Sequence, residues 1–333
     1  MTALLEIEDL TVRFRVGSPL IARLRGHPAP VLTAVDGLTL SVERGTALGI
    51  VGESGCGKST LARTVVGLEA ADAGRMRLDG IELGPSRSID LRRRIQMVFQ
   101  DPSSALNPKF TVERTLRELV RMQNGVDASR CRARCEELMA LVDLPIETLD
   151  RRPAGLSGGQ RQRVSIARAL ALEPELLIAD ESVAALDVSV QASILNLFGD
   201  LRRELGLTII LISHDLSVVR QTCQDVAVMY LGTIVEHRRT DELIDDPWHP
   251  YTQALIAAAP RFGSRREPGS FALGGEPPSP MATRSGCAFA PRCPQAIERC
   301  SRDVPALLGD DRHGRVACHV AENPMLLKER DSQ

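Results

Sequence analysis

Short apolar runs alternate with helical patterns over about the first 260 residues of the chain. Three runs, LGIV at 48–51, ELLIADE at 175–181 and LTIILISHD at 207–215, are typical of buried strands, and the last two end in acidic or histidine residues. Near-continuous apolar strands are characteristic of parallel sheets that are covered on both faces. The pattern therefore predicts an α/β domain with a mostly parallel sheet. Ligands of such sheets bind beyond the carboxyl ends of the strands, where these polar residues lie.

Two regions depart from this alternation. Residues from about 105 to 160 carry helical patterns, at 112–122 and 129–144, without strong strand runs, which predicts a helical subdomain inserted into the α/β core. Residues 261–333 contain eight of the twenty prolines and little periodicity. We therefore expect an α/β domain at 1–260 and a small C-terminal domain at 261–333, entered through a linker near RFGSRREPGS. We find no internal repeat.

The segment GESGCGKS at 52–59 matches the phosphate-loop pattern G-x-x-x-x-G-K-[ST]. Its glycines let backbone N–H groups surround phosphate oxygens, and the following helix directs its N-terminus at the same anion. Lys58 is expected to reach the β- and γ-phosphates, and Ser59 to ligate Mg²⁺. A glycine turn with a chance lysine would match in roughly one chain in a hundred of this length. The strand before the segment and the helical pattern after it favour a nucleotide site, formed by Gly52, Glu53, Ser54, Gly55, Cys56, Gly57, Lys58, Ser59 and Thr60.

Acidic and histidine residues at two strand ends are the candidates for catalysis. Asp180 is placed to hold Mg²⁺ through water, and Glu181 to orient and polarise the attacking water. Paired acids can also simply cap the next helix. His214 could hydrogen-bond the γ-phosphate or the water, although a lone histidine at a strand end is more often structural.

A third candidate is AGLSGGQRQRVSIARALAL at 154–172. Ser157 can cap the helix that follows, and Gln160 would complete a capping box. The stripe of Val164, Ala167 and Leu170–Ala171 predicts the buried face of that helix. One interpretation is a well-capped helix after a Gly-Gly turn. The other is a second helix N-terminus that binds phosphate.

Composition and charge exclude some classes of protein. The net charge is −2, so no overall basic field favours nucleic acid or anionic lipid. No apolar run approaches the ~18 residues of a membrane span. The start, MTALLEIEDL, does not resemble a secretory signal, so we expect the chain in the reducing cytosol. Any role at a membrane would require a partner.

The eight cysteines are unevenly distributed, because four fall in the pattern C-x5-C-x6-C-x17-C, formed by Cys287, Cys293, Cys300 and Cys318. A disulfide framework is disfavoured in the cytosol. Structural zinc sites usually contain C-x2-4-C pairs, which are absent here. Iron–sulfur clusters tolerate wider spacing. Four buried free cysteines are the remaining alternative.

Taken together, these motifs resemble ATP-binding cassette (ABC) proteins. The resemblance is carried by GESGCGKS, VFQDP at 98–102, LSGGQRQR, LLIADES, AALD at 184–187 and ISHD. It narrows to the oligopeptide/dipeptide importer ATPases, a group that includes nickel importer ATPases, on VFQDPSSALNP, DESVAALDVSVQASILNLF, VMYLGTIVE, HPYTQAL and the C-terminal cysteine segment. It covers about residues 5–320. The implied fold is an ABC-type P-loop NTPase core with a helical subdomain and a small cysteine-containing C-terminal domain.

The resemblance also implies roles for further residues. Gln100 would sense the γ-phosphate and, with Ser59, hold Mg²⁺. Phe14 is the candidate for stacking on adenine, with core packing of an edge strand as its alternative. The four C-terminal cysteines would ligate a [4Fe–4S] cluster, which suits a module with little core of its own. The residues implied to contact the ATP of a second cassette are Leu156, Ser157, Gly158, Gly159 and Gln160.

The implied partners are a second, homologous ATPase subunit facing this one head to tail, two transmembrane permease subunits and an extracytoplasmic solute-binding protein. The chain would then lie at the cytoplasmic face of the cell membrane and drive uptake of peptides, or of nickel or another small solute. Non-transport ABC ATPases that act on DNA or ribosomes are disfavoured, because they carry tandem cassettes, long coiled-coil insertions or basic tails.

Three positions depart from the family pattern. Ser182 stands where the family usually has proline after the catalytic glutamate. Ala184 replaces a serine of the D-loop, whose Asp187 is retained, so we expect weaker contact between the two ATP sites. Arg151-Arg152-Pro153 replaces Arg-Tyr-Pro in the region that couples to the permease.

Overall fold

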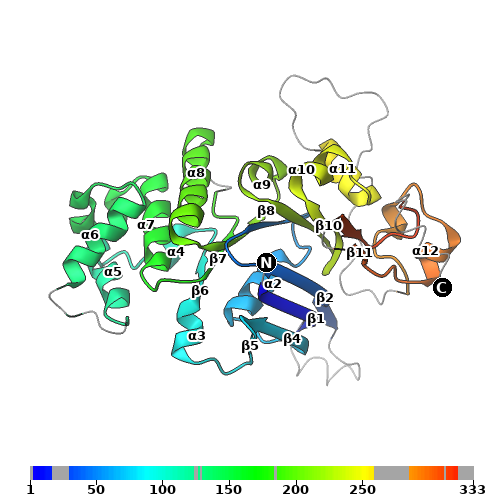
Figure 1. Ribbon diagram of the computed structural model, residues 1–333, viewed down its shortest axis with the longest axis horizontal. Helices are drawn as coiled ribbons and strands as arrows, with labels where there is room; N and C mark the ends of the chain where they lie inside the picture. Colours follow the sequence, from blue (N-terminus) through cyan, green and yellow to red (C-terminus); the bar gives the residue numbers. More distant parts are fainter. Residues whose placement is uncertain are drawn as a thin grey trace.

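A computed structural model of the chain describes residues 3–16, 30–123, 127, 130–183, 186–258, 285–310 and 313–321. Two sheets lie one above the other, with a group of helices at one end of the long axis and the C-terminal segment at the other (Figure 1). An α/β architecture with a mostly parallel main sheet is therefore present, as the apolar runs predict.

The larger sheet has eight strands in the order β11-β12-β10-β9-β3-β8-β7-β6. The five strands from β9 to β6 run parallel, and β10, β12 and β11 continue the sheet with antiparallel pairing. The parallel strands are β3 (Ala47–Val51), β6 (Ile95–Val98), β7 (Leu176–Asp180), β8 (Thr208–Ser213) and β9 (Asp225–Tyr230). The antiparallel edge consists of β10 (Thr233–Arg239), β11 (Leu308–Asp310) and β12 (Gly314–Val316).

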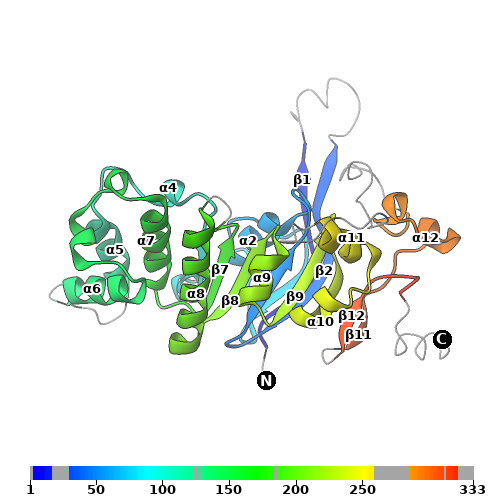
Figure 2. The same cartoon turned by 90° about the horizontal axis from the view of Figure 1, so that it is seen from above.

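The smaller sheet is antiparallel, in the order β2-β1-β4-β5. Its strands are β1 (Ala3–Arg15), β2 (Val31–Glu43), β4 (Ala73–Leu78) and β5 (Ile81–Glu82). β1 and β2 are long and project together beyond the rest of the molecule (Figure 2).

The helices divide into those that flank the sheets, those of the inserted subdomain, and those of the C-terminal segment. Beside the sheets lie α2 (Lys58–Val66), α3 (Ile89–Arg94), α8 (Val188–Leu205), α9 (Leu216–Thr222), α10 (Thr240–Asp245) and α11 (Pro250–Ala258). The insertion contains α4 (Pro102–Ala105), α5 (Val112–Val120), α6 (Cys131–Leu141), η1 (Ile146–Asp150), η2 (Pro153–Gly155) and α7 (Gly158–Leu170). The C-terminal segment contains η3 (Ala290–Arg292) and α12 (Glu298–Arg302). The predicted helices at 112–122 and 129–144 therefore exist, each slightly shorter than its pattern.

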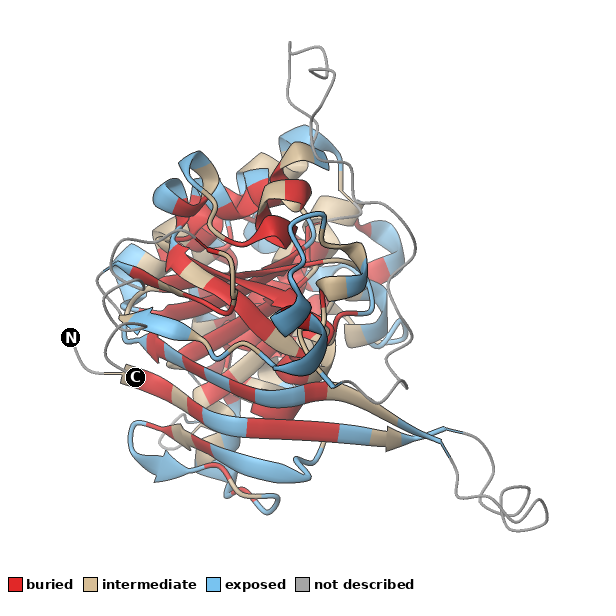
Figure 3. Ribbon diagram, turned by 90° about the vertical axis from the view of Figure 1, so that its right-hand side faces the viewer, coloured by how far each residue is buried: buried red, intermediate tan, exposed pale blue. Residues whose placement is uncertain are grey.

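Burial explains why the apolar runs become central strands. All residues of β3, β7 and β8 are buried, and buried positions concentrate on the central strands (Figure 3). Alternate residues face opposite sides, as strand geometry requires: Ile209 and Leu211 pack with the core under α7 and α8, whereas Ile210 and Ile212 pack with the core shared by α2 and the smaller sheet.

The described part of the C-terminal segment is joined to the large sheet rather than separate from it. β12 pairs with β10 through Glu236–Val316 and His237–Arg315. Sequence periodicity did not predict β11 or β12, because each has only three residues. The boundary proposed at residue 260 lies outside the described residues.

Candidate functional site

The phosphate loop lies between the end of β3 and the start of α2, beyond the carboxyl edge of the parallel strands. A pocket of about 290 Å³ opens there. Its lining includes residues from the loop, from the smaller sheet and from just beyond the ends of β6, β7 and β9: Phe14, Leu32, Thr33, Ala34, Ser54, Gly55, Cys56, Gly57, Lys58, Ser59, Thr60, Gln100, Glu181 and Leu231. The structure thus brings most of the predicted nucleotide residues to one cavity.

Gly57 shows why the loop must contain glycine at this position. Its φ of 107° is in the left-handed region, directly before the first residue of α2. A Cβ at this position would lie 2.1 Å from the carbonyl oxygen of Ala34, closer than any real contact. The loop backbone therefore packs directly against β2 and leaves the N-terminus of α2 open toward the pocket.

Lys58 is a buried cation in this pocket, with only 4% of its surface exposed. Its Nζ donates to the carbonyl oxygens of Gly52, at 2.7 Å, and Glu53, at 2.9 Å. Among the described residues no carboxylate forms an ion pair with it. A buried charge without a counterion is costly, so the site is suited to an anion, and a phosphate group matches the geometry of the loop.

The two acidic residues at the end of β7 have different environments. The hydroxyl of Ser59 donates to Oδ1 of Asp180 at 3.0 Å, which joins the loop to the strand end. Burial raises the pKa of the Asp180 carboxyl, and the neighbouring Glu181 adds to that effect. Asp180 does not line the pocket itself. A position behind Ser59 is compatible with contact to Mg²⁺ through water.

Glu181 holds a backbone conformation that is rare for a residue with a side chain, with φ of 43°. Its Oε2 accepts a hydrogen bond from Nε2 of Gln100 at 2.9 Å. Nδ1 of His214 lies 3.7 Å from the other oxygen, and 57% of the His214 side chain is exposed. Strained backbone of this kind often occurs at active sites, and here it directs the carboxylate toward the pocket between Gln100 and His214.

Phe14 lines the same pocket from β1, while part of its ring packs against the core of the smaller sheet. The position of Phe14 is therefore compatible with both interpretations of the sequence, stacking on adenine and packing of an edge strand.

The LSGGQ segment begins α7, and its predicted capping box is present. The Ser157 hydroxyl accepts from the amide of Gln160 at 3.2 Å, and Oε1 of Gln160 accepts from the amide of Ser157 at 3.0 Å. The predicted apolar stripe is also buried, with Val164 and Ala167 at 0% exposure. None of these residues lines the phosphate pocket of the same chain. Leu156 is 5% exposed and packs in the core.

Asp187 is the N-cap residue of α8, and Gly159 approaches that helix closely, since a Cβ on it would lie 2.6 Å from Cγ1 of Val190. Ser157 is exposed and Gly158 is partly exposed. The N-terminus of α7 is therefore accessible to another molecule. The departure at Ala184 lies outside the described residues.

The structure places Glu53 differently from the rest of the loop. Neither Gly52 nor Glu53 lines the pocket. The Glu53 carboxylate instead pairs with Arg292, and its amide N–H donates to the hydroxyl of Tyr251 at 2.8 Å. The sequence motifs did not single out Arg292 or Tyr251 as site residues. The only available signals were their positions inside HPYTQAL and the cysteine segment.

The four C-terminal cysteines lie near one another. The amide of Cys287 donates to the carbonyl oxygen of Cys300 at 2.8 Å. Burial raises the pKa of Cys287, Cys293 and Cys318, and each is close enough to another of the four for its charge to add to that effect. Within the described ranges, however, no group of three His, Cys, Asp or Glu residues is placed to hold a metal ion. The iron–sulfur cluster therefore stays a prediction.

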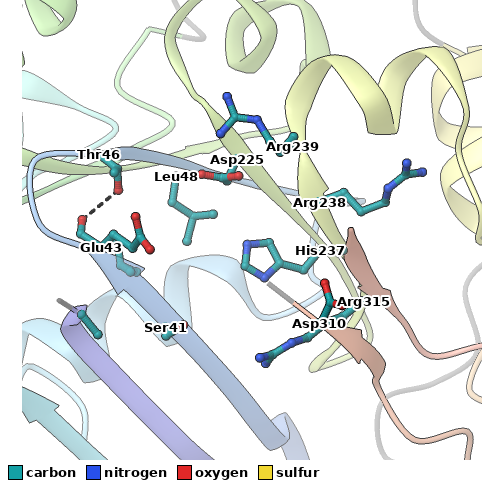
Figure 4. A pocket seen from close by; sticks show the side chains of 13 residues that line it. Ser41, Glu43, Thr46, Leu48, Asp225, His237, Arg238, Arg239, Asp310 and Arg315 are labelled. Atoms are coloured by element: carbon teal, nitrogen blue, oxygen red, sulfur yellow. Dashed lines mark hydrogen bonds between the residues drawn. The ribbon is translucent and has the colours of Figure 1, made fainter. Parts of the chain in front are cut away.

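A second pocket, of about 300 Å³, lies at the opposite ends of the strands (Figure 4). It is lined by residues of both charges, including Glu43, Asp225, Arg239 and Arg315. The residues at the start of β3 and β9 line it, so it is on the side of the sheet away from the phosphate loop.

In the part of the chain that the structure describes, no helix combines the length and apolar character needed to cross a bilayer.

Comparison with known proteins identifies the family. Residues 35–184 match the family model described as ABC transporter, and residues 235–300 match the model described as oligopeptide/dipeptide transporter, C-terminal region. The chain is 47% identical to a probable peptide ABC transporter ATP-binding protein of Sinorhizobium fredii, over 96% of this chain and 90% of the relative. It is 44% identical to the oligopeptide transport ATP-binding protein OppF of Escherichia coli, over 95% of each chain.

Solved structures agree with the fold. The dimeric ATP-binding cassette MJ0796 in a post-hydrolysis state, bound to ADP and Pi, aligns with a TM-score of 0.61 and 26% identity, over 71% of this chain and 98% of that one. The cbiO1 protein of Clostridium perfringens, part of the ABC transporter complex cbiONQ, aligns with a TM-score of 0.64 and 29% identity, over 74% of this chain and 92% of that one. The chain belongs to the ATP-binding subunits of ABC transporters, in the oligopeptide/dipeptide group, and is an ATPase of that family.

Proposed function

We propose that this chain hydrolyses ATP to drive the uptake of oligopeptides or dipeptides across the cytoplasmic membrane. The observation that carries the proposal is Lys58, a buried cation at the start of α2 without an ion-pair partner among the described residues. The relatives named as peptide transport ATP-binding proteins support the choice of solute.

The residues in and around the pocket would have separate roles in hydrolysis. Lys58 and the backbone amides of the loop would bind and orient the phosphates. Ser59 and Gln100, with Asp180 through water, would hold Mg²⁺, which supplies charge neutralisation on the phosphates when bound. Glu181 would orient and polarise the attacking water, and His214 would hydrogen-bond that water or the γ-phosphate. Developing negative charge would be stabilised by preorganised donors.

One chain leaves this site incomplete. The N-terminus of α7 does not line the pocket of its own chain but has the capped geometry and dipole that suit a phosphate. We propose that Ser157, Gly158, Gly159 and Gln160 contact ATP bound to a second, homologous cassette, with Asp187 near the same interface. ATP binding would close the pair and hydrolysis would release it.

The remaining partners follow from the same proposal. The helical subdomain would dock on two transmembrane permease subunits, and an extracytoplasmic solute-binding protein would deliver the peptide. The chain would lie on the cytoplasmic face of the membrane as a peripheral subunit.

Equilibrium binding of Mg·ATP to the purified chain tests the nucleotide site. Lys58→Ala should weaken binding by about a hundredfold or more, because charge-assisted hydrogen bonds to phosphate are lost. Lys109→Ala removes an exposed lysine and serves as the matched control. Unchanged binding in Lys58→Ala would contradict the assignment of this pocket.

The solute is tested by transport. Cells that lack the gene for this chain should lose uptake of labelled dipeptides or oligopeptides and regain it with the wild-type chain, but not with Lys58→Ala. Retained peptide uptake together with loss of labelled nickel uptake would replace the peptide proposal with a nickel importer of the same family.

We further propose that Cys287, Cys293, Cys300 and Cys318 ligate an iron–sulfur cluster. Their proximity and the small local core, which contains Val316 and Ala321, support a role in holding the module together. Chain purified without oxygen should contain iron and sulfide and absorb visible light. Cys293→Ala should lose both, whereas Cys131→Ala, which removes a cysteine of α6, should keep them. A colourless protein with zinc or no metal would refute the cluster.

A further inference from the structure

Arg292 connects the C-terminal segment to the phosphate loop. It ends η3, between Cys287 and Cys293, and forms two parallel hydrogen bonds with Glu53. Nη1 lies 2.7 Å from Oε2, and Nη2 lies 2.9 Å from Oε1. The arginine side chain is 5% exposed and the glutamate side chain 23%. Paired geometry and burial make this a strong contact, unlike exposed ion pairs on the surface.

The contact acts on a residue that also touches the phosphate-binding lysine. The Glu53 carbonyl oxygen accepts the hydrogen bond from Nζ of Lys58, and its amide donates to Tyr251. Glu53 is therefore held at its side chain, its N–H and its C=O by three different elements. A shift of Glu53 would move the carbonyl group that positions Lys58.

The backbone that carries Arg292 is held in place by aromatic packing at the start of η3. Phe289, which directly precedes η3 and is 2% exposed, packs in the main core. Its ring lies 5.3 Å from that of Tyr230 and 5.5 Å from that of Tyr251, measured between centroids. The Tyr230 hydroxyl also lies 3.4 Å from Nη1 of Arg292. Since aromatic packing fixes the start of η3, the guanidinium is presented to Glu53 in one position.

Charge is the second consequence of the pair. Glu53 places a carboxylate in the loop that must accept a highly negative triphosphate. The hydrogen bonds to Glu53 raise the pKa of Arg292, so the guanidinium stays charged and balances that carboxylate. Without Arg292, the half-buried Glu53 carboxylate would be left in the phosphate loop with no ion-pair partner among the described residues, and its negative charge would oppose the binding of phosphates nearby.

We propose that Arg292 is a positioning residue for nucleotide binding, which holds the phosphate loop through Glu53 and neutralises that carboxylate, so that the C-terminal module sets the affinity for ATP. The inference rests on the ATP site proposed above. The C-terminal module would then act directly on the affinity of the site for ATP.

Three variants of the full-length chain test it, by equilibrium binding of Mg·ATP and by the KM and kcat of hydrolysis. Arg292→Gln should weaken ATP binding about tenfold, which equals about 1.4 kcal/mol, and raise KM with little change in kcat. Glu53→Gln removes the anion and keeps a hydrogen-bond acceptor for Arg292, so it should bind ATP as tightly as wild type or about threefold more tightly. The double variant should recover to within about threefold of wild type.

The matched control is Arg299→Gln, which removes an exposed arginine paired with Asp303 on α12 of the same module. It should leave ATP affinity unchanged. If the Arg292–Glu53 pair served only to hold the fold together, adding Glu53→Gln would not restore the ATP affinity lost in Arg292→Gln. The double variant therefore separates positioning from general stability. Should Arg292→Gln fail to fold, Glu53→Gln decides the proposal alone: an ATP affinity equal to or above that of wild type supports it, and an affinity about tenfold weaker overturns it.

Two results would overturn the inference: ATP affinity of Arg292→Gln within twofold of wild type, or affinity in Glu53→Gln about tenfold weaker than wild type. If the wild-type chain itself fails to bind ATP, the proposed function fails instead.

Discussion

Glu181 combines three features that few residues share: a positive φ, a position at the end of a fully buried strand, and a carboxylate held from two sides. The hydrogen bond from Gln100 and the proximity of His214 leave one face of the carboxylate toward the pocket. This arrangement is suited to orienting a water molecule.

Glu181→Gln should keep ATP binding but lose about a hundredfold or more of its turnover, because an amide cannot accept a proton from water. Binding and phosphate release measured on the same preparation separate the two effects. Glu173→Gln, at an exposed glutamate paired with Arg134, is the control. Hydrolysis near the wild-type rate in Glu181→Gln would contradict the role given to this residue.

His249 is a buried neutral histidine near the junction of the two parts of the chain. Its Nδ1 accepts from the Tyr251 amide at 3.0 Å, and the ring also hydrogen-bonds the backbone of Ala317. Burial lowers the pKa of His249 to about 3, far below its usual value of about 6.5.

This depressed pKa predicts acid lability. Between pH 6.5 and 3 the unfolded chain binds a proton at this histidine that the folded chain does not. The free energy of unfolding should therefore fall as pH falls, by at most about 1.4 kcal/mol per pH unit from this group. Denaturant titrations at several pH values should show a shallower loss in His249→Asn than in wild type. His313→Asn, at an exposed histidine, should keep the wild-type slope, and equal slopes in all three would count against the prediction.

Among the elements, α7 is the one whose details follow most directly from its sequence. Ser157 and Gln160 form the capping box that S-x-x-Q predicts, and the apolar stripe is buried. Local hydrogen bonds and a 3.6-residue period suffice to specify this helix, so no distant contact was needed to predict it.

Ser157→Ala should lower the free energy of unfolding by about 1 kcal/mol, because the Gln160 amide loses its acceptor. Ser157→Thr keeps the hydroxyl and should retain most of the stability. Urea denaturation of the isolated chain measures both. No difference between the alanine and threonine variants would mean that the cap contributes nothing to stability.

β11 and β12 are the opposite case. Each is three residues long, and their pairing depends on β10, which lies more than sixty positions earlier in the chain. Periodicity needs longer runs than these to indicate a strand. The two strands that extend the main sheet therefore could not be predicted, because they lie in a proline-rich segment without a periodic pattern of apolar residues.

In the whole molecule, the described C-terminal residues are bound to the ATPase core by more than a strand edge. Phe289 enters the main hydrophobic core, and Cys287, Ala288 and Cys293 pack against it. The described part of this segment therefore packs against the same hydrophobic core as the ATPase domain.

Phe289→Ala should reduce the free energy of unfolding by about 3–5 kcal/mol, since it removes a fully packed ring from the core. Leu308→Ala, at a partly exposed position on β11, should cost much less. Chemical denaturation gives both values, and limited proteolysis should release the C-terminal segment sooner in Phe289→Ala. A cost near that of Leu308→Ala would show that the module is held elsewhere.

The parallel α/β core, the phosphate loop and the capped helix α7 could all be predicted from the sequence, because each depends on local periodicity, glycine positions or hydrogen bonds between near neighbours in the chain. The family followed from those motifs. The contact of Glu53 with Arg292, away from the pocket, could be found only in the folded chain, because these residues are 239 positions apart and their contact depends on how Phe289 packs. Such long-range contacts leave no periodic or local pattern. For that reason the sequence drew attention to the cysteines of the C-terminal segment and not to Arg292, the residue of that segment that contacts the phosphate loop.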